Sequence, residues 1–558
     1  MEDAFSLCEP RLVPCGEGYS FFHDLVERRW PKNGPLHRLC SLARKMGVQS
    51  YVSETLAPND EIRQEIEAVA KHPDYAGSPV TGRAIRLSFF RSCPKAWQDV
   101  TSEDFLGYAV MLELLQDGKR LRHNGRRMAF VLESVVRPPT IFLDASDGRT
   151  SAESASNYYV HCTRPFKSVV GIASHSVSLQ IDGSFFCQQN GLTHVCVHAA
   201  LRTAINSSPS IRGPRVPEKL TNLKINEILG VDYADKASVG RLRGGLNAKE
   251  IEKVVNDMGL YPKSYEFPNH HHIGYAEYVY PLIESRFPVI LGVYGQMGGH
   301  AIAVLGHTVN SDRWEPQARD GYGAFPLVRY HSSSLWADHF IIADDNVGMH
   351  VTLPREMIRN FLVPEFDPNL HASMAVGLVP RTVRVNGYDA EALASRIAEQ
   401  FLKSTVSRPG CRWLRFLRGT IDRRGDHHHP TLVCRTVLTT RDCYCQEMAH
   451  AKDSEPPHNA LTAGEVELLK RVLPRTIWVT EISLPDLYTA NKHKIGDLII
   501  DAGATRDKHQ NCDSLVFAWL PGIARCGPGL ATVVPDWSLK GHVRLLRHGD
   551  RTIPRLEW

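Results

Sequence analysis

Apolar residues along this chain repeat at helical spacing in some stretches and form short continuous runs in others. In residues 61–71, Ile62, Ile66 and Val69 fall on one side of a helix. Apolar runs separated by turn-rich segments predict strands at residues 105–115, 128–136, 140–143 and 158–161. The N-terminal region, residues 1–165, is therefore expected to mix helices with strands.

The central region, residues 166–375, continues this alternation. A strand-like run leads into a loop, and Cys196 then begins a short helix rich in alanine and leucine. Pro209 and the small polar residues before it end that helix. Further on, Asn247 and Glu250 have the spacing of a capping box and mark the start of a second amphipathic helix.

Strand patterns dominate the rest of the chain. Buried strands are predicted after Pro288, in the run HAIAVLGHT that begins at His300, and in HFIIA before Asp344. The C-terminal region begins with a helical pattern at residues 392–402 and continues with the apolar runs TIWVTEI, DLIIDAG and SLVFAWL. The sequence thus predicts an α+β protein with three regions, at residues 1–165, 166–375 and 376–558.

Composition narrows the class of protein. The chain has 558 residues, and 65 Lys and Arg against 61 Asp and Glu leave a net charge of only +4, so nothing favours a nucleic-acid or acidic-membrane partner. The basic segment at residues 119–127 lacks interleaved aromatic residues and is interpreted as a solvated hairpin tip. No apolar run reaches the ~20 residues that a membrane helix needs. With no secretory signal and an odd number of scattered cysteines, 13, we expect a reduced, cytoplasmic protein.

The candidate chemistry centres on Cys196, which stands where a loop gives way to a helix. A cysteine attacks as its thiolate, and a helix N-terminus and a neighbouring imidazolium both favour that form. His300 at the start of a strand could supply the imidazolium, and Asp344 or Asp345 after the next strand could orient its ring. Gln189 could donate a hydrogen bond to a tetrahedral oxyanion.

This order of a glutamine, a cysteine on a helix, a histidine on a strand and an aspartate after the next strand resembles the papain-like cysteine peptidase superfamily. The resemblance is greatest to the bacterial peptidases that trim double-glycine leader peptides. It extends over residues 185–353 and includes the patterns GL-x-x-x-E-I, I-E-x-x-x-P-V-I-L and G-H-A-I-A-V-L-G. It implies a papain-like core in which the helix carrying the nucleophile packs on an antiparallel sheet.

The resemblance also implies roles for the matching residues. Cys196 would be the nucleophile, His300 the general base and acid, and Gln189 an oxyanion donor together with the backbone N–H of Cys196. An aspartate would orient His300, and neither a metal nor another cofactor is implied. The substrate would be a protein or peptide, cleaved at a peptide or isopeptide bond. The flanking regions would select substrate, and the C-terminal region could bind a regulatory protein.

Two features depart from the family pattern. The family usually has glutamine six residues before the cysteine, where this chain has Asn190, and Gln188 and Gln189 lie just upstream. Either the loop is one residue longer or Asn190 takes the role. The orienting carboxylate is also ambiguous, because Asp344 follows the strand directly, whereas Asp345 has the better spacing to a downstream glycine. Asp344 is favoured as the orienting residue.

Other classes of function remain open. The chain could be a non-catalytic recognition or sensor protein that keeps the fold, with Cys196 as a buried core thiol. It could also be a thiol acyltransferase of the transglutaminase type, which passes the acyl group to an amine. The sequence has no P-loop, no H-E-x-x-H and no G-x-S-x-G, which removes the commonest ATPase, zincin and serine-hydrolase interpretations.

Three further groups of histidine and cysteine are interpreted as structural rather than metal-binding. His194 and His198 flank the cysteine at offsets that do not converge, so we expect solvated or supporting histidines. The triplet at residues 270–272 is expected to be an exposed turn. In the third group, a strand with alternating cysteines is favoured over zinc. That group comprises His427, His428, His429, Cys434, Cys443, Cys445 and His450.

Overall fold

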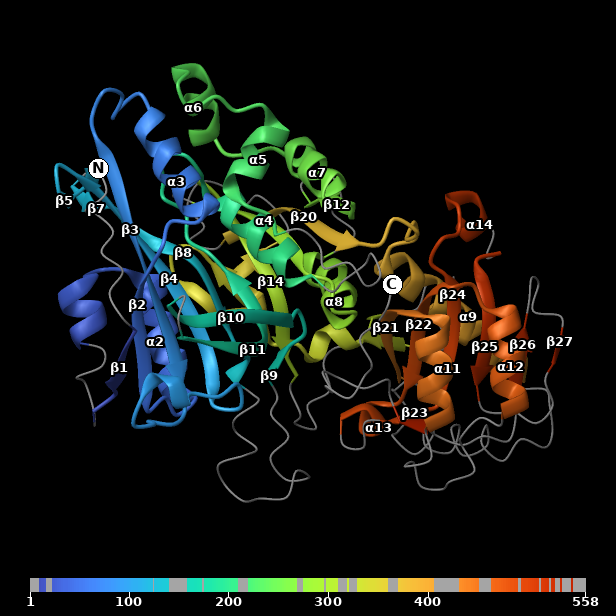
Figure 1. Cartoon of the computed structure of the whole chain (residues 1–558). Coiled ribbons are helices and arrows are strands. Elements are labelled where there is room, and N and C mark those ends of the chain that lie inside the picture. Colours follow the sequence, from blue (N-terminus) through green and yellow to red (C-terminus); the bar gives the residue numbers. More distant parts are fainter. Residues whose placement is uncertain are drawn as a thin grey trace.

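The computed structural model describes residues 10–16, 23–123, 125–139, 158–172, 175–208, 219–267, 274–295, 298–309, 319–320, 329–359, 370–405, 431–450, 463–489, 493–510, 513–520, 523–526, 532–533 and 543–544. Within these residues the protein is α+β, as expected, and is built on three large, mainly antiparallel sheets (Figure 1). Among the described helices, none is long and apolar enough to cross a membrane.

The first sheet belongs mainly to the N-terminal region. Its order is β1 (Arg11–Pro14), β2 (Ser50–Leu56), β3 (Val80–Phe90), β4 (Phe105–Gln116), β8 (Ala129–Val136), β11 (His175–Phe186) and β10 (Arg164–Ile172), with β5 (Lys119–Arg120) beside β4. The hairpin β6 (Arg122–His123) and β7 (Arg126–Arg127) lies beyond β5, which confirms the predicted hairpin tip. The helical elements here are η1 (His23–Arg29), α2 (Gly34–Lys45), α3 (Asp60–Lys71) and η2 (Trp97–Asp99).

The second sheet lies at the centre of the molecule. Its order is β12 (Tyr261–Glu266), β20 (Leu370–Val379), β13 (Val289–Gly295), β14 (Gly298–Thr308), β17 (His339–Asp344) and β18 (Gly348–Pro354). Two short strands extend it, β9 (Tyr158–Val160) on β14 and β19 (Ile358–Arg359) on β20. The accompanying helices are α4 (Cys196–Ser207), α5 (Asn222–Leu229), α6 (Lys236–Arg243), α7 (Ala248–Asp257), α8 (Tyr275–Glu284), η5 (Ser333–Trp336) and η6 (Arg355–Met357).

The third sheet forms the lobe at the right of Figure 1. Its order is β15 (Arg319–Asp320), β16 (Arg329–Ser332), β21 (Thr431–Thr440), β22 (Thr476–Ser483), β24 (Gly496–Asp501), β25 (Leu515–Leu520), β26 (Ile523–Cys526) and β27 (Thr532–Val533). A small ribbon pairs β23 (His493–Lys494) with β28 (Val543–Arg544). The helices are α9 (Gly387–Thr405), α11 (Arg441–His450), α12 (Ala463–Val472), α13 (Pro485–Thr489) and α14 (Arg506–Gln510).

The three sequence regions are interlocked. Strand β10 begins at Arg164 and, with β11, belongs to the first sheet, so the expected boundary at residue 165 falls inside a hairpin. Strand β16 of the central region pairs in parallel with β21 of the C-terminal region. The largest buried apolar cluster runs from α2 through α4 and the second sheet to β21 and β24. The regions therefore share a core.

Local predictions are largely confirmed, with one clear correction. The helix at residues 61–71 and the strands at 105–115, 128–136 and 158–161 are present within a residue or two, whereas 140–143 lies outside the described residues. Cys443 and Cys445 do not alternate along a strand but lie in α11. Strand β21 ends at Thr440, whose hydroxyl accepts a hydrogen bond from the backbone N–H of Cys443 (3.2 Å), which starts a helix.

A buried ionic network joins α3 to α4. The Arg202 side chain is 0% exposed and donates to Glu61 Oε1 over 2.6 Å, while Lys219 binds the other oxygen of that carboxylate over 2.5 Å. These contacts fix α4, and with it the start of that helix, against the N-terminal region.

Replacing Arg202 with methionine is expected to lower the free energy of unfolding by about 3 kcal/mol, because it leaves part of a buried carboxylate uncompensated. The matched control is Arg63→Met, since Arg63 pairs with Asp60 at 4.0 Å with both side chains largely exposed, and its loss should cost less than about 0.5 kcal/mol. Urea unfolding measures both changes. Equal effects would contradict the assignment of Arg202 as a buried brace.

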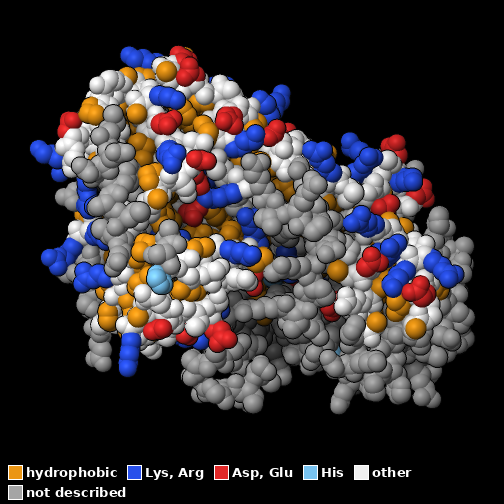
Figure 2. Space-filling view, viewed as in Figure 1, with side chains coloured by type: hydrophobic (Ala, Val, Ile, Leu, Met, Phe, Trp, Pro, Cys, Tyr) orange, Lys and Arg blue, Asp and Glu red, His pale blue; other side chains and the backbone are white. Residues whose placement is uncertain are grey.

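Figure 2 shows one face of the molecule. Lys and Arg side chains are interspersed with Asp and Glu among the described atoms of this face, and neither sign gathers in one large patch. The near-balance of the composition is thus also seen in the spatial distribution of charge on this face.

Candidate active site

Cys196 is the first residue of α4, as the sequence predicts. The loop that precedes it is held by Asn190, whose Oδ1 accepts hydrogen bonds from the backbone N–H groups of Leu192 (2.8 Å) and Thr193 (2.9 Å). Gly191 has a positive φ of 72°, which the tight turn requires. The helix packs against β14 and β11, and Cys196 is only partly buried. The thiol therefore lies at a helix N-terminus.

The three candidate oxyanion residues have different environments. The side-chain oxygen of Gln188 accepts hydrogen bonds from Asn33 Nδ2 (3.1 Å) and from the backbone N–H of Val131 (3.2 Å). Asn190 also donates to Thr193 Oγ1 over 2.8 Å, so both ends of its amide serve the loop. Gln189 is partly buried and lies close to Asp345, where it partly offsets the rise in the pKa of that carboxyl that burial causes. Of the three, Gln189 faces the candidate site.

His300 lies on β14, and two carboxylates meet its ring. His300 Nε2 is 3.2 Å from Asp344 Oδ2 and 3.5 Å from Asp345 Oδ1. Asp344 ends β17, and the pairing of β17 with β18 is irregular between Ile342 and Asp344. Strand alternation alone would send Asp344 and Asp345 to opposite faces, but the irregularity and the turn that follows direct both toward His300.

The thiol of Cys196 completes this group. It lies close enough to the His300 ring to raise the pKa of that ring. The hydrogen bond between His300 and Asp344 is well formed, whereas the contact between His300 and the Cys196 thiol is looser. Catalytic contacts are often loose before substrate binds. Because Nε2 faces the carboxylates, Nδ1 is the ring nitrogen left for proton exchange with the thiol.

The electrostatics favour a charged imidazole. Burial by itself lowers the pKa of His300, but hydrogen bonding with Asp344 and Cys196 and the charges of both aspartates raise it to about 10. The pKa of Asp344 is lowered despite its burial, because it is hydrogen-bonded to His300 and to the backbone N–H groups of Asn346 and Val347. Burial raises the pKa of Asp345 to about 6. The two aspartates therefore differ, and Asp344 is the better stabilised anion.

Helix α2 of the N-terminal region supports both sides of the site. Asn33 caps this helix and reaches Gln188 in the loop before the cysteine. A Cβ atom on Gly34 would lie 2.8 Å from the carbonyl oxygen of Asn346, so the helix start fits closely against the aspartate turn. Asn33 is thus a positioning residue that sequence reasoning missed. Its only local signal is an N-cap residue before Gly-Pro, which predicts a helix start but no long-range contact.

The two histidines that flank the cysteine are not solvated, contrary to one part of the expectation. His194 is 1% exposed and pairs with Glu65 at 3.3 Å, and His198 is 0% exposed with its Nε2 at 2.9 Å from Asn226 Oδ1. Burial lowers the pKa of His198 to about 4. Both side chains point into the packing around α4, so they support the helix.

Among the described residues, two groups have donor atoms close enough together for one metal ion. One is His300 with Asp344 and Asp345, and the other is His161 with Glu284 and His307. The histidines at 270–272 and 427–429 lie outside the described residues.

No protein-family model, curated protein or solved structure matches this chain. The chemistry of the site is therefore inferred from its own side chains.

Proposed function

We propose that this protein is a cysteine peptidase, or a closely related thiol-dependent amide hydrolase, with a papain-like core. The observation that carries the proposal is the convergence of Cys196, His300 and Asp344 from a helix start, a strand and a strand end that lie far apart in sequence. A helix N-terminus, an imidazolium and an orienting carboxylate are the groups that activate a thiol.

In the proposed reaction the sulfur of Cys196 attacks the carbonyl carbon of an amide and forms a tetrahedral oxyanion. The side chain of Gln189 and the backbone N–H of Cys196 donate hydrogen bonds to that oxyanion. His300 donates its proton to the leaving amine, and the acyl group remains on sulfur as a thioester. A water molecule, deprotonated by His300, then hydrolyses the thioester and restores the thiol.

The rate of alkylation by iodoacetamide tests the proposal without a known substrate. At about pH 6, where an ordinary thiol is mostly protonated, Cys196 should react at least about tenfold faster than Cys93. Cys93 is the matched control because it is exposed, whereas Cys196 is only partly exposed, so accessibility alone predicts the opposite order. Peptide mapping by mass spectrometry assigns the labelled sites.

His300→Ala provides the second arm of this experiment. It should remove the excess reactivity of Cys196 while leaving Cys93 unchanged, because the imidazolium that favours the thiolate is lost. If Cys196 reacts no faster than Cys93 in the unaltered protein, the proposed peptidase function is wrong.

The pH dependence of turnover should be asymmetric. His300 has a pKa raised to about 10, so it stays charged through neutral pH, and on the alkaline side kcat/KM should not fall until the pH rises toward that value and the ring loses its proton. The same sign applies to stability: the contribution of the charged ring is present below the ordinary pKa of about 6.5 and is lost as the pH rises through about 10.

Asp345→Asn tests the origin of this alkaline limb. Removing one of the negative charges that face the ring should move the limb to lower pH, without abolishing turnover. A pH–rate profile of both proteins measures the shift. A limb that falls near pH 6.5 in the unaltered protein, or that does not move in the variant, would contradict this electrostatic account.

A further inference from the structure

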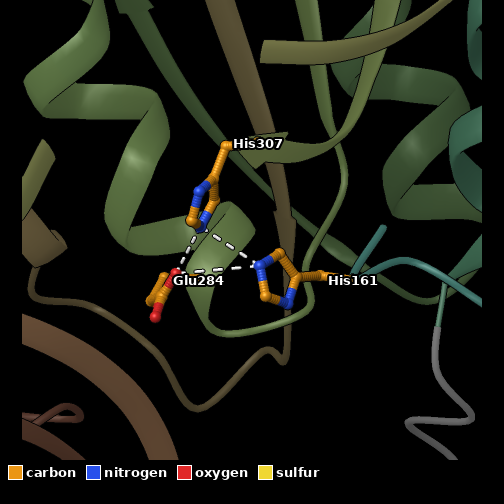
Figure 3. A group of neighbouring side chains, drawn as sticks. All are labelled: His161, Glu284 and His307. Atoms are coloured by element: carbon orange, nitrogen blue, oxygen red, sulfur yellow. Dashed lines mark hydrogen bonds and ion pairs between the residues drawn. The ribbon is translucent and has the colours of Figure 1, made fainter. Parts of the chain in front are cut away.

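Three buried side chains outside the candidate active site converge on one point (Figure 3). His161 follows β9, Glu284 is the last residue of α8, and His307 lies on β14. His307 Nε2 is 2.5 Å from Glu284 Oε2 and 3.1 Å from His161 Nε2, and His161 Nε2 is 3.7 Å from Glu284 Oε2. The side chains are between 0% and 2% exposed.

Both imidazole rings are held in orientation by their neighbours. His307 Nδ1 is 3.0 Å from the carbonyl oxygen of Thr308, an acceptor that fixes the proton on Nδ1 and leaves Nε2 as the nitrogen that points into the group. The ring of Tyr280 packs 4.8 Å from that of His307, and the ring of Tyr159 stacks on that of His161 at 6.0 Å. A backbone bond to a ligating imidazole is the usual support for a metal-binding histidine.

The contacts of His307 Nε2 require a proton or a metal ion at this point. With Nδ1 protonated, a neutral His307 presents a lone pair on Nε2, and that lone pair faces a carboxylate oxygen at 2.5 Å. Lone pairs of two acceptors do not approach so closely unless a proton or a metal ion lies between them. The arrangement therefore needs either a proton shared between His307 and Glu284 or a bound cation.

A chain of buried ion pairs adjoins this group. Arg435 pairs with Glu284 Oε1 at 2.6 Å and with Glu481 at 2.5 Å. Lys494 pairs with Glu481 at 2.8 Å and with Asp497 at 3.0 Å. Arg435 binds Oε1 of Glu284, and Oε2 faces the two histidines.

We propose that His161, Glu284 and His307 form a binding site for a divalent transition-metal ion, with Zn²⁺ as the best match. Two imidazole nitrogens and one carboxylate oxygen are a donor set that zinc accepts, and donors on a tetrahedral zinc lie about 3.3 Å apart for bonds of about 2.0–2.1 Å. The three separations among these donor atoms, 2.5, 3.1 and 3.7 Å, lie on both sides of that value. Small side-chain shifts would bring all three atoms to bonding distance.

The position of the site points to a structural role. Glu284 ends α8, and the next residue, Ser285, accepts a hydrogen bond from the backbone N–H of Leu438 in β21 over 2.7 Å. His161 directly follows β9 and His307 lies on β14, both strands of the second sheet, whereas Arg435 lies on β21 of the third. A metal ion here would join α8 to the second sheet beside the contact with the third. This role does not depend on the chemistry of Cys196.

Metal analysis of the full chain, purified without chelators and then dialysed against Zn²⁺, tests the proposal. We expect about one tightly bound zinc per chain at this site. His161→Gln should weaken zinc binding at least about a hundredfold. His350→Gln is the matched control, because His350 is also fully buried but lies outside the group, and it should keep the metal. His300→Gln should keep it as well.

Cobalt substitution in the unaltered chain gives a readout that does not depend on a variant folding. Co²⁺ at this site should show visible ligand-field bands of a tetrahedral or five-coordinate ion without the sulfur-to-metal charge-transfer band of a cysteine ligand. The proposal is overturned by an absence of tight binding of Zn²⁺ and Co²⁺, by a cysteine charge-transfer band, or by loss of metal in His300→Gln but not in His161→Gln. The first of these outcomes would place a proton rather than a metal ion between His307 and Glu284.

Discussion

Replacing Cys196 with alanine is expected to lower kcat/KM for a peptide amide by about 10⁴-fold or more, because the covalent route through the thioester disappears. The measurement is hydrolysis of a peptide that the unaltered protein cleaves, selected from a mixed peptide library by mass spectrometry. The unfolding temperature of the variant should stay close to that of the parent protein, since the Cys196 side chain is only partly buried.

Cys187→Ala is the matched control for this substitution. Cys187 lies in the same loop but is fully buried, and its sulfur is 3.9 Å from the carbonyl oxygen of Ala199. Burial raises the pKa of its thiol to about 11, which makes it a poor nucleophile at neutral pH. This variant should keep turnover within about tenfold of the parent once its stability is taken into account. If Cys187→Ala were inactive and Cys196→Ala active, the assignment of the nucleophile would be wrong.

The parts of the site that could be predicted are those with a local signal. A turn-rich loop before an alanine-rich run marks a helix start, and this places Cys196 at the N-terminus of α4. Apolar runs of strand length place His300 and Asp344 on β14 and at the end of β17. Periodicity says which residues share an element but not which elements meet. The order of these residues in the chain suggested the meeting; in the structure His300 Nε2 lies 3.2 Å from Asp344 Oδ2, and Cys196 is near enough to the His300 ring to raise its pKa.

Long-range contacts had no such signal. Asn33 and Gln188 are joined across 155 positions of sequence, and nothing near either residue predicts the other. His161, Glu284 and His307 come from three elements and occupy unremarkable apolar stretches, so their spacing matches no metal-binding motif. The boundary expected at residue 165 was misplaced for a related reason, because strand pairing between β11 and β8 decides it and composition does not.

Replacing Asp344 with alanine is expected to lower kcat/KM by about 10²–10⁴-fold, the range for an imidazole that loses its orienting carboxylate. Asp344 Oδ2 contacts His300 Nε2, while Oδ1 accepts hydrogen bonds from the backbone N–H groups of Asn346 (2.8 Å) and Val347 (3.3 Å). The carboxylate is thus fixed at both oxygens, and its low pKa keeps it charged. Steady-state kinetics on the same peptide as above measures the loss.

Asp345→Ala should cost less than about tenfold at neutral pH. Its oxygens have no hydrogen-bond partner of strict geometry, and its pKa near 6 means that it carries its charge at neutral pH but loses it more readily than Asp344 does. It acts on His300 through charge rather than through a fixed hydrogen bond, and a charge at 3.5 Å can be removed without releasing the ring.

Asp344→Asn separates the loss of charge from the loss of the hydrogen bonds, because an amide can keep the backbone hydrogen bonds while losing the charge. The reverse order of effects in the two alanine variants would transfer the orienting role to Asp345. Near-normal turnover in both variants and in the double variant would leave a Cys196–His300 dyad as the catalytic unit.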